Sequence, residues 1–321
     1  MRILVSGAAG FIGSHVVRRL AAAHHTVIAI GRQSKGSSQG EHRVADLATD
    51  FLDPLLEGCD AIVHCAARAA PWGERTLFWR DNVLATERLL DAARRAGTVR
   101  RFVQISTPSI YFRYQNGENI AEAFMPPKRW PTYYAETKWV AECRVREAPM
   151  LGPIILRPRA VFGPGDRAIV PRILAAVQRG VLILPNGGKA LIDITCVDNV
   201  ASAVEHALIA DRECEGRAFN ITNGEPLQVR DILTRLFSAL KISVRFRSIP
   251  ISLALMAARA SEAMAKLRVG RPEPRLTTYG VGLLGYTQTL SLEAARIGLN
   301  YSPMVTINQG LERYAGWWLG Q

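Results

Sequence analysis

Cysteine is scarce in this 321-residue chain, and its five cysteines include no pair with the two-residue spacing of common zinc and redox motifs. We therefore expect reduced thiols, no disulfide framework and no bound metal, which is the pattern of a cytoplasmic protein. No uncharged apolar run reaches the ~18 residues that a membrane-spanning helix needs. The first apolar run ends at Gly7, too early for a secretory leader, so none is expected.

Acidic residues are also few. The chain has 40 lysines and arginines but 28 aspartates and glutamates, which gives a net charge of +12. The basic residues are dispersed in short pairs and do not alternate with aromatic residues, so we do not expect a nucleic-acid partner. Hydrophobic residues make up 48% of the chain and charged residues 21%, a globular composition. The length suits one large domain or two closely joined ones.

The first half of the chain alternates between short apolar runs and helical patterns. Helices are expected over 11–24, 74–96 and 131–147. Strands are expected at 3–6, 26–30, around Val44, and at 61–65, 102–106 and 154–156. This alternation predicts an α/β fold of the Rossmann type, a doubly wound parallel sheet with helices on both faces.

The pattern becomes looser after Pro158. Helices are expected at 167–179, 197–210 and 227–240, with short strands at 191–196 and 217–221. We interpret this part as a smaller, mixed substrate lobe. The predicted division is a dinucleotide-binding domain over 1–160, to which 190–222 returns, and a substrate lobe made of 161–189 and 223–321.

Three glycines, Gly7, Gly10 and Gly13, lie between the first strand and the first helix. Gly7 permits a tight turn, Gly10 lets the backbone approach a pyrophosphate, and Gly13 lets the helix pack against the strand. The helix then offers unpaired N–H groups and a positive dipole end to phosphate. This context predicts a dinucleotide site.

The second expected strand ends in Gly31-Arg32, where a carboxylate for the ribose 2′-hydroxyl would be expected. Without that carboxylate nothing repels a 2′-phosphate, and the Arg32 guanidinium can pair with one. We therefore expect NADP as the cofactor rather than NAD.

Tyr134 and Lys138 are four residues apart and share one face of an expected helix, whereas Tyr133 does not face the lysine. A nearby ammonium lowers the pKa of a phenol, and such a phenol can exchange a proton with a ketone or alcohol during hydride transfer. A hydroxyl is also needed to hold the carbonyl oxygen. Ser106, Thr107 and Ser109 all lie at or just after the end of the fifth strand, and spacing does not choose among them.

Taken together, these motifs make the chain resemble the extended short-chain dehydrogenases/reductases. The resemblance is carried, in chain order, by Gly7–Gly13, His64–Ala67, Asn82–Thr86, Ser106–Tyr111, Tyr134–Lys138, Arg157–Pro158 and Phe162–Asp166.

The resemblance implies a role for individual residues. It assigns the catalytic hydroxyl to Thr107, proton transfer to Tyr134, and a supporting role to Lys138 and Asn82. The implied cofactor contacts are Gly7, Ala9, Gly10, Phe11, Ile12, Gly13, Arg32, Asp46, Leu47, Ala66, Ala67, Tyr134, Lys138 and Pro158. It further implies a homodimer built through the helices at 74–96 and 131–147.

Within this superfamily the chain is most similar to the 3β-hydroxysteroid dehydrogenase/isomerase branch, which includes bacterial 2-alkyl-3-oxoalkanoate reductases. The resemblance is carried by Leu156–Asp166, Phe219–Pro226 and Thr107–Phe112. It implies an NADP(H)-dependent oxidoreductase that interconverts a secondary alcohol and a ketone on an apolar substrate of the 3-hydroxysteroid, sterol or 3-oxoacyl type.

Aromatic residues near the expected cleft fit such an apolar ligand. They are Trp72, Phe112, Tyr114 and Trp130. The alternative is a nucleotide-sugar epimerase or dehydratase with tightly held NAD(P). A dehydratase would place an Asp-Glu pair after Thr107, and this chain has Pro108-Ser109 instead.

The segment 245–275 combines apolar residues with seven basic and two acidic ones. A basic amphipathic helix of this kind could touch an anionic membrane surface. We favour the other interpretation, a lid helix over the substrate site.

Overall fold

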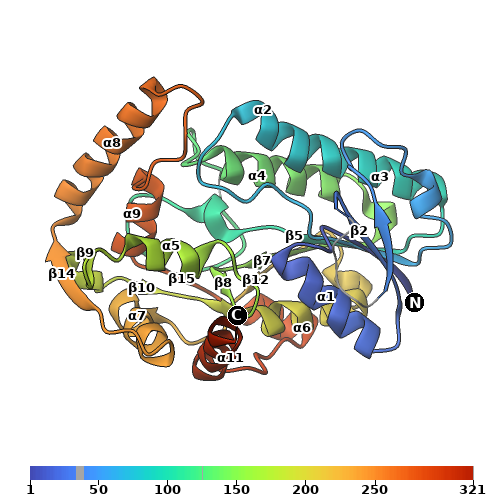
Figure 1. Ribbon diagram of the computed structural model, residues 1–321. Helices are drawn as coiled ribbons and strands as arrows, with labels where there is room; N and C mark the ends of the chain where they lie inside the picture. Colours follow the sequence, from blue (N-terminus) through green and yellow to red (C-terminus); the bar gives the residue numbers. More distant parts are fainter. Residues whose placement is uncertain (34–39, 125, 321) are drawn as a thin grey trace.

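A seven-stranded sheet forms the centre of the molecule in the computed structural model, which describes residues 1–33, 40–124 and 126–320 (Figure 1). Its strand order is β12-β7-β5-β4-β1-β2-β3, and every neighbouring pair is parallel. The strands are β1 (Arg2–Ser6), β2 (Thr26–Gly31), β3 (Glu41–Val44), β4 (Ala61–His64), β5 (Arg101–Ile105), β7 (Pro153–Pro158) and β12 (Ala218–Ile221). The predicted doubly wound parallel sheet is confirmed.

Helices cover both faces of this sheet. They are α1 (Phe11–Ala22) and α6 (Val197–Leu208) on one face, and α3 (Ala85–Ala96) and α4 (Tyr133–Arg146) on the other (Figure 1). Alternate residues of β1 enter the two separate cores, with Ile3 and Val5 packed against the first pair and Leu4 against the second. Because both faces are buried, the strands read as continuous apolar runs in the sequence.

The strand order reverses between β1 and β4. The chain passes outward from β1 through β2 to β3, then returns to add β4, β5, β7 and β12 on the other side. In open α/β sheets the crevice at such a reversal, outside the carboxyl ends of the strands, is where ligands bind. The glycine turn follows β1 at this position.

A smaller lobe is built on a four-stranded sheet of order β13-β10-β15-β6, in which β10 and β13 are antiparallel. Its strands are β6 (Gly117–Ile120), β10 (Leu191–Ile192), β13 (Leu227–Gln228) and β15 (Gln288–Leu290). Two parallel pairs accompany it, β8 (Val161–Phe162) with β11 (Thr195–Cys196), and β9 (Val181–Pro185) with β14 (Arg245–Ile249). The mixed lobe therefore exists, whereas the domain boundaries stay predictions.

The helices of this lobe are α5 (Ile169–Ala176), α7 (Val229–Ala239), α8 (Ile251–Leu267), α9 (Thr278–Gly285), α10 (Glu293–Leu299) and α11 (Ile307–Leu319). A short helix α2 (Arg75–Phe78) and a π-helical turn, η2 (Trp79–Leu84), precede α3. The helices expected at 167–179, 197–210 and 227–240 are present and slightly shorter. The sequence did not predict α9, α10 or α11.

Helix α8 lies at the outer edge of the smaller lobe (Figure 1). Its buried side is made of small residues such as Ala254 and Ala258, while Leu253 and Met256 on another side are exposed. The loop after α8 reaches back to the larger lobe, where the Trp72 indole donates a hydrogen bond of 2.9 Å to the carbonyl of Arg271. Within the described residues, no helix is both long and apolar enough to cross a membrane.

The helices expected at a dimer interface, α3 and α4, lie side by side (Figure 1). The Arg144 guanidinium of α4 pairs with Glu87 of α3 at 2.8 Å. Leu84, just before α3, is exposed. The homodimer itself stays a prediction.

Candidate active site

The glycine turn has a geometry that only glycine tolerates at two of its three positions. Gly7 has a φ of +67°, and a Cβ there would lie 2.7 Å from the backbone of Ala66. A Cβ on Gly13 would lie 2.2 Å from the carbonyl oxygen of Gly7. The loop after β4 and the first turn of α1 thus both pack directly on the turn, with no space for a side chain between them.

The amino end of α1 is open to a ligand. Gly10 is its N-cap and makes no side-chain cap, and its first turn holds no acidic residue. Ala9 and Gly10 are exposed, and Phe11 and Ile12 are half-buried. A helix end without a capping side chain offers its N–H groups and dipole to a phosphate. These residues fit the pyrophosphate of a dinucleotide.

Charged residues gather beyond the end of β2. The Arg32 side chain is 61% exposed and lies 3.7 Å from Asp81, a carboxylate that also accepts from Arg68. Asp46 accepts from Arg80 at 2.5 Å, and the Ala48 amide together with Arg80 and Arg32 holds the pKa of its carboxyl below the usual value against the effect of burial. A Cβ on Gly31 would make only ordinary contacts, at 3.5 Å from Ala9, so sterics do not explain the missing side chain.

The other residues expected near the cofactor lie around the same crevice. Leu47 and Pro158 are buried, whereas Ala67 is exposed. The Ala66 amide donates to the Ser6 hydroxyl at 3.4 Å. These contacts join the end of β1 to the loop after β4, so Ala66 lies against the glycine turn.

Asn82 lies in the π-helical turn η2 and is fully buried. Its side chain donates to the Thr137 hydroxyl at 2.9 Å and accepts from the Arg68 amide at 2.7 Å. Thr137 immediately precedes Lys138 on α4. Asn82 therefore positions the helix that carries the tyrosine and lysine, and π-helical turns of this kind are frequent at functional sites.

The Tyr134 phenol lies close enough to the Thr107 hydroxyl for that hydroxyl to act on the pKa of the phenol. Thr107 follows the carboxyl end of β5, and its hydroxyl donates to Ser109 at 2.9 Å. Ser109 also accepts from the phenol of Tyr279, at 2.7 Å. Among the three hydroxyls that the sequence left open, the structure therefore places Thr107 beside Tyr134 and Ser109 one step further away.

Burial raises the pKa of Tyr134 to about 12, and the Thr107 hydroxyl only partly opposes this shift. Burial lowers the pKa of the Lys138 ammonium to about 8, against the raising effect of Glu142. The Lys138 ammonium donates to the carbonyl of Ile105 at 2.6 Å. The lowered tyrosine pKa that the spacing suggested is absent here, because the burial of the phenol dominates.

A buried ion-pair network supports the strand ends behind Lys138. The carboxylate of Glu142, one turn after Lys138 on α4, accepts from Arg157 Nη2 at 2.6 Å and from the Ser106 hydroxyl. Arg157 also donates to the hydroxyl of Tyr111 and to the carbonyl of Glu122. This network fixes β5, β7 and α4 relative to one another, so Ser106 has a structural partner.

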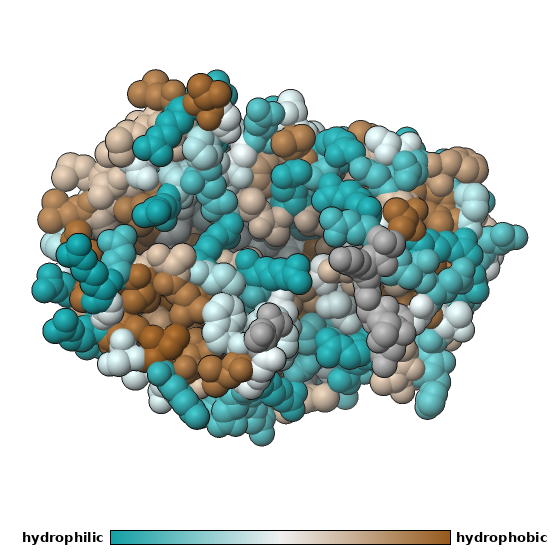
Figure 2. Space-filling model, viewed as in Figure 1, coloured by the Kyte–Doolittle hydropathy of each residue, from teal (hydrophilic) through white to brown (hydrophobic). Residues whose placement is uncertain are grey.

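Aromatic side chains form one wall beside Thr107. The Phe112 ring makes edge-to-face contacts with Tyr114 and Tyr279, with centroids 5.1 and 5.2 Å apart. Trp130 instead packs near Trp139, in a separate cluster, so its expected place in the pocket is not supported. Figure 2 shows that this face of the molecule is hollowed near its centre, between the helices that Figure 1 labels α4 and α5.

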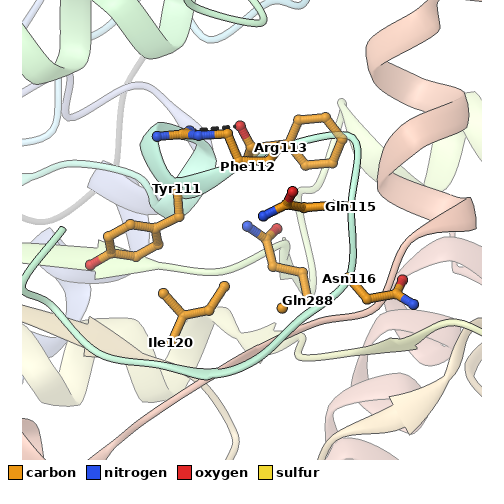
Figure 3. Close-up of a pocket in the computed structure, with 8 residues that line it drawn as sticks. Tyr111, Phe112, Arg113, Gln115, Asn116, Ile120 and Gln288 are labelled. Carbon is orange, nitrogen blue, oxygen red and sulfur yellow. Dashed lines mark hydrogen bonds between the residues drawn. The ribbon is translucent and has the colours of Figure 1, made fainter. Parts of the chain in front are cut away.

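A small cavity of about 50 Å³ borders Phe112, one residue of this wall (Figure 3). Tyr111, Phe112, Ile120 and Gln288 are among the residues that line it. Its volume suits one or two water molecules and not a substrate. The cavity is therefore not the substrate site.

Two further residues of this region were not predicted from the sequence. Tyr279 belongs to α9, far along the chain from the other site residues, and no local motif marks it. Arg159 follows the buried end of β7, and its charge directly after such a strand was the available signal.

The sequence profile of the NAD dependent epimerase/dehydratase family matches residues 3–222, more than half of the chain. The chain belongs to this family. The predicted resemblance to the extended short-chain dehydrogenases/reductases is thereby confirmed, and with it the prediction of an NAD(P)-dependent enzyme.

Individual members of the family resemble the chain along its whole length. A 2-alkyl-3-oxoalkanoate reductase of Stenotrophomonas maltophilia is 33% identical over 98% of this chain and 98% of its own. The mouse sterol-4-alpha-carboxylate 3-dehydrogenase (decarboxylating) is 29% identical over 96% of this chain and 88% of its own. Among solved structures, MoeE5 in complex with UDP-glucose and NAD has a TM-score of 0.78 at 25% identity, covering 100% of this chain and 99% of that one.

Proposed function

We propose that this protein reduces the ketone of an apolar 3-oxo substrate to a secondary alcohol with NADPH. The proximity of Tyr134 on α4 to Thr107, just after the carboxyl end of β5, supports the proposal most directly. The bound nicotinamide supplies the hydride. A Thr107 hydroxyl within reach of the carbonyl oxygen would hold it, and Tyr134 would donate the proton that turns the developing alkoxide into an alcohol.

The protonation states favour the reductive direction. With a pKa raised to about 12, the Tyr134 phenol carries its proton at neutral pH and can give it to an alkoxide. Lys138, with a pKa lowered to about 8, is still mostly charged at neutral pH. Its charge would stabilise the phenolate that remains after the proton has left.

The charged residues beyond the end of β2 favour NADPH over NADH as the cofactor. Arg32 is exposed and its partner Asp81 is shared with other arginines. A guanidinium in this setting can pair with a 2′-phosphate, and Gly31 presents no carboxylate against it.

An apolar substrate agrees with the aromatic wall and with the relatives. Tyr114 is exposed and packs edge-to-face on the buried Phe112 ring, which in turn contacts Tyr279, so this cluster offers an aromatic surface suited to alkyl chains or fused rings. The relatives named above include a reductase of 2-alkyl-3-oxoalkanoates and a dehydrogenase of a sterol carboxylate. We therefore propose a 3-oxoacyl or 3-oxosterol type of substrate.

A substrate panel tests the proposal. 2-Alkyl-3-oxoalkanoates, their methyl esters, 3-oxosteroids and UDP-glucose are each incubated with the protein, and NADPH oxidation is followed by absorbance. We expect NADPH consumption with at least one of the 3-oxo compounds. Turnover of UDP-glucose without added cofactor, and of none of the ketones, would contradict the proposal.

A nucleotide-sugar epimerase is the second candidate, favoured by the likeness to MoeE5 in complex with UDP-glucose and NAD. The aromatic wall near Thr107 argues against a sugar as the reacting group. The panel separates the two functions, because an epimerase recycles its own nicotinamide and consumes no NADPH.

A further inference from the structure

Arg159 is a buried arginine whose guanidinium has no hydrogen-bond partner in the described part of the chain. The residue is 5% exposed, and its Nε is buried and unpartnered. Its backbone is well held, since its amide donates to Ile221 at 3.0 Å and its carbonyl accepts from the Thr195 hydroxyl. Only the charged end of the side chain is left without a partner.

Arg157, two residues earlier, shows what a structural arginine looks like in this fold. It is equally buried, yet it pairs through two nitrogens with Glu142 and donates to the Tyr111 hydroxyl and the Glu122 carbonyl. Its pKa is raised by these partners, whereas the pKa of the Arg159 guanidinium is lowered by burial. The fold thus satisfies one buried arginine fully and leaves the neighbouring one unsatisfied.

A buried guanidinium without an anion is costly, because desolvation is not repaid by any pairing. Among the described residues, Asp193 is a carboxylate that acts electrostatically on Arg159, but it forms no ion pair with it and instead accepts from the Leu290 amide at 2.8 Å. An anion from outside the chain would supply the missing partner.

Arg159 lies beside the reacting groups. Ile105 of β5 pairs with Leu156 of β7, so Thr107 and Pro158 leave the sheet at the same level, on neighbouring strands. Tyr279 joins the two sides, since its phenol donates to Ser109 and it acts electrostatically on both Arg159 and Tyr134. Arg159 and Thr107 therefore follow neighbouring strand ends, and Tyr279 acts on both Arg159 and Tyr134.

The phosphates of the cofactor are too distant to be the missing anion. The glycine turn follows β1, and Arg32 follows β2. β7 is separated from β1 by β5 and β4, which is three strand spacings or roughly 14 Å. A ligand at the substrate side of the crevice is the remaining source.

We propose that the guanidinium of Arg159 binds the carboxylate of the substrate, and that the protein therefore acts on free 3-oxo acids. The inference rests on the proposed function, because it names which 3-oxo compounds the Tyr134–Thr107 pair reduces. A planar guanidinium pairs with a carboxylate through two hydrogen bonds, which also orients the ligand. In a 3-oxo acid the carboxylate is two bonds from the carbonyl carbon, so holding the acid fixes where the ketone lies.

The test compares an acid with its neutral ester in wild type and in Arg159→Met. A 2-alkyl-3-hydroxyalkanoic acid and its methyl ester are oxidised with NADP⁺, because the hydroxy acid does not decarboxylate. We expect Arg159→Met to lower kcat/KM for the acid by roughly 30-fold or more, the usual consequence of removing one partner of a desolvated charge pair. The ester should be oxidised equally well by both proteins. Arg245→Met, at an exposed arginine far along the chain, is the matched control and should change neither.

Two further measurements separate ligand binding from structure. Calorimetric titration of the hydroxy acid into the protein–NADP⁺ complex should show the same loss of affinity in Arg159→Met. The ligand-free variant should melt at a temperature equal to or above that of wild type, because a buried unpaired charge has been removed. A lower melting temperature with equal losses for acid and ester would mean that Arg159 is structural, and would overturn the proposal.

The outcomes also distinguish this inference from the proposed function. If acid and ester are both oxidised with an unchanged ratio in Arg159→Met, the function holds and the carboxylate proposal is wrong. If neither compound is turned over, titration of the acid still tests the proposal, and equal binding by wild type and variant overturns it. If the protein binds UDP and this binding is lost in Arg159→Met, the arginine binds the diphosphate of a nucleoside diphosphate, and the carboxylate proposal is wrong.

Discussion

The ammonium group of Lys138 donates a hydrogen bond of 2.6 Å to the carbonyl oxygen of Ile105, the last residue of β5. The lysine is thereby tied to the strand that carries Thr107 two residues later. Its own helix, α4, carries Tyr134 one turn earlier. One buried ammonium thus links the strand and the helix that supply the two groups proposed to act on the carbonyl.

The pH dependence of reduction should report Lys138. Its pKa is lowered by burial to about 8, so its charge is present below that pH and is lost as the pH rises through it. Tyr134, with a pKa raised to about 12, stays protonated over the whole accessible range. We expect kcat/KM for ketone reduction to be flat below pH 8 and to fall above it. A profile that stays flat to pH 9.5 would contradict the role of the ammonium.

Tyr134→Phe should abolish most of the activity. Loss of the proton donor is expected to lower kcat by about 10²–10⁴-fold, while NADPH binding, measured by fluorescence titration, stays nearly unchanged. Tyr133→Phe is the matched control, because Tyr133 is exposed and its ring contacts Phe78. Equal losses in the two variants would show that Tyr134 has no special role.

Gly31→Asp should move the cofactor preference from NADPH to NADH. A side chain fits at this position, since a Cβ would make only ordinary contacts. The new carboxylate can accept from a ribose 2′-hydroxyl and would repel a 2′-phosphate, so the KM ratio should change by roughly tenfold or more. Gly31→Ala serves as the steric control and should leave the ratio unchanged. Lower KM for NADH in the wild type would refute the NADP assignment.

The exposed side of α8 makes the membrane hypothesis testable. Leu253, Met256, Met264 and Leu267 form an exposed apolar stripe on this helix, and the exposed Arg259 and Lys266 flank it. If the stripe contacts anionic lipid surfaces, the protein should sediment with phosphatidylserine vesicles at low salt, whereas the lid interpretation that we favour predicts no sedimentation. Vesicles of phosphatidylcholine alone and the double variant Leu253→Glu, Met256→Glu are the controls. No sedimentation at low salt would exclude the contact, leaving the lid interpretation.

The parallel sheet could be predicted well from the sequence because the apolar residues that define each of its strands are consecutive in the chain. Strands such as Ile3–Ser6 and Ala61–Cys65 are apolar except for one polar residue each, Ser6 and His64, since helices cover both faces. The small sheet could not be predicted in the same way. Its strands β6 and β15 pair Gly117 with Gln288, residues far apart in the chain, and neither strand has an apolar run.

The same distinction applies to the site. Gly7, Tyr134 and Lys138 belong to short motifs whose spacing indicates their chemistry, whereas Thr107 was selected by the family resemblance. Arg159 and Tyr279 meet near Thr107 only through tertiary folding, so no spacing rule could find them. The direction of the Tyr134 pKa shift also required the structure, because it depends on how deeply the phenol is buried.

The pairing of β12 with β7 has a consequence for biosynthesis. At ~5–20 residues per second, β7 emerges several seconds before β12 exists, and during that time its outer edge has no partner. We expect nascent chains that end between the two strands to need chaperone protection, and truncated proteins that stop near residue 160 to aggregate. The synthesis of β12 thus also sets when the exposed edge of β7 in the nascent chain can be covered.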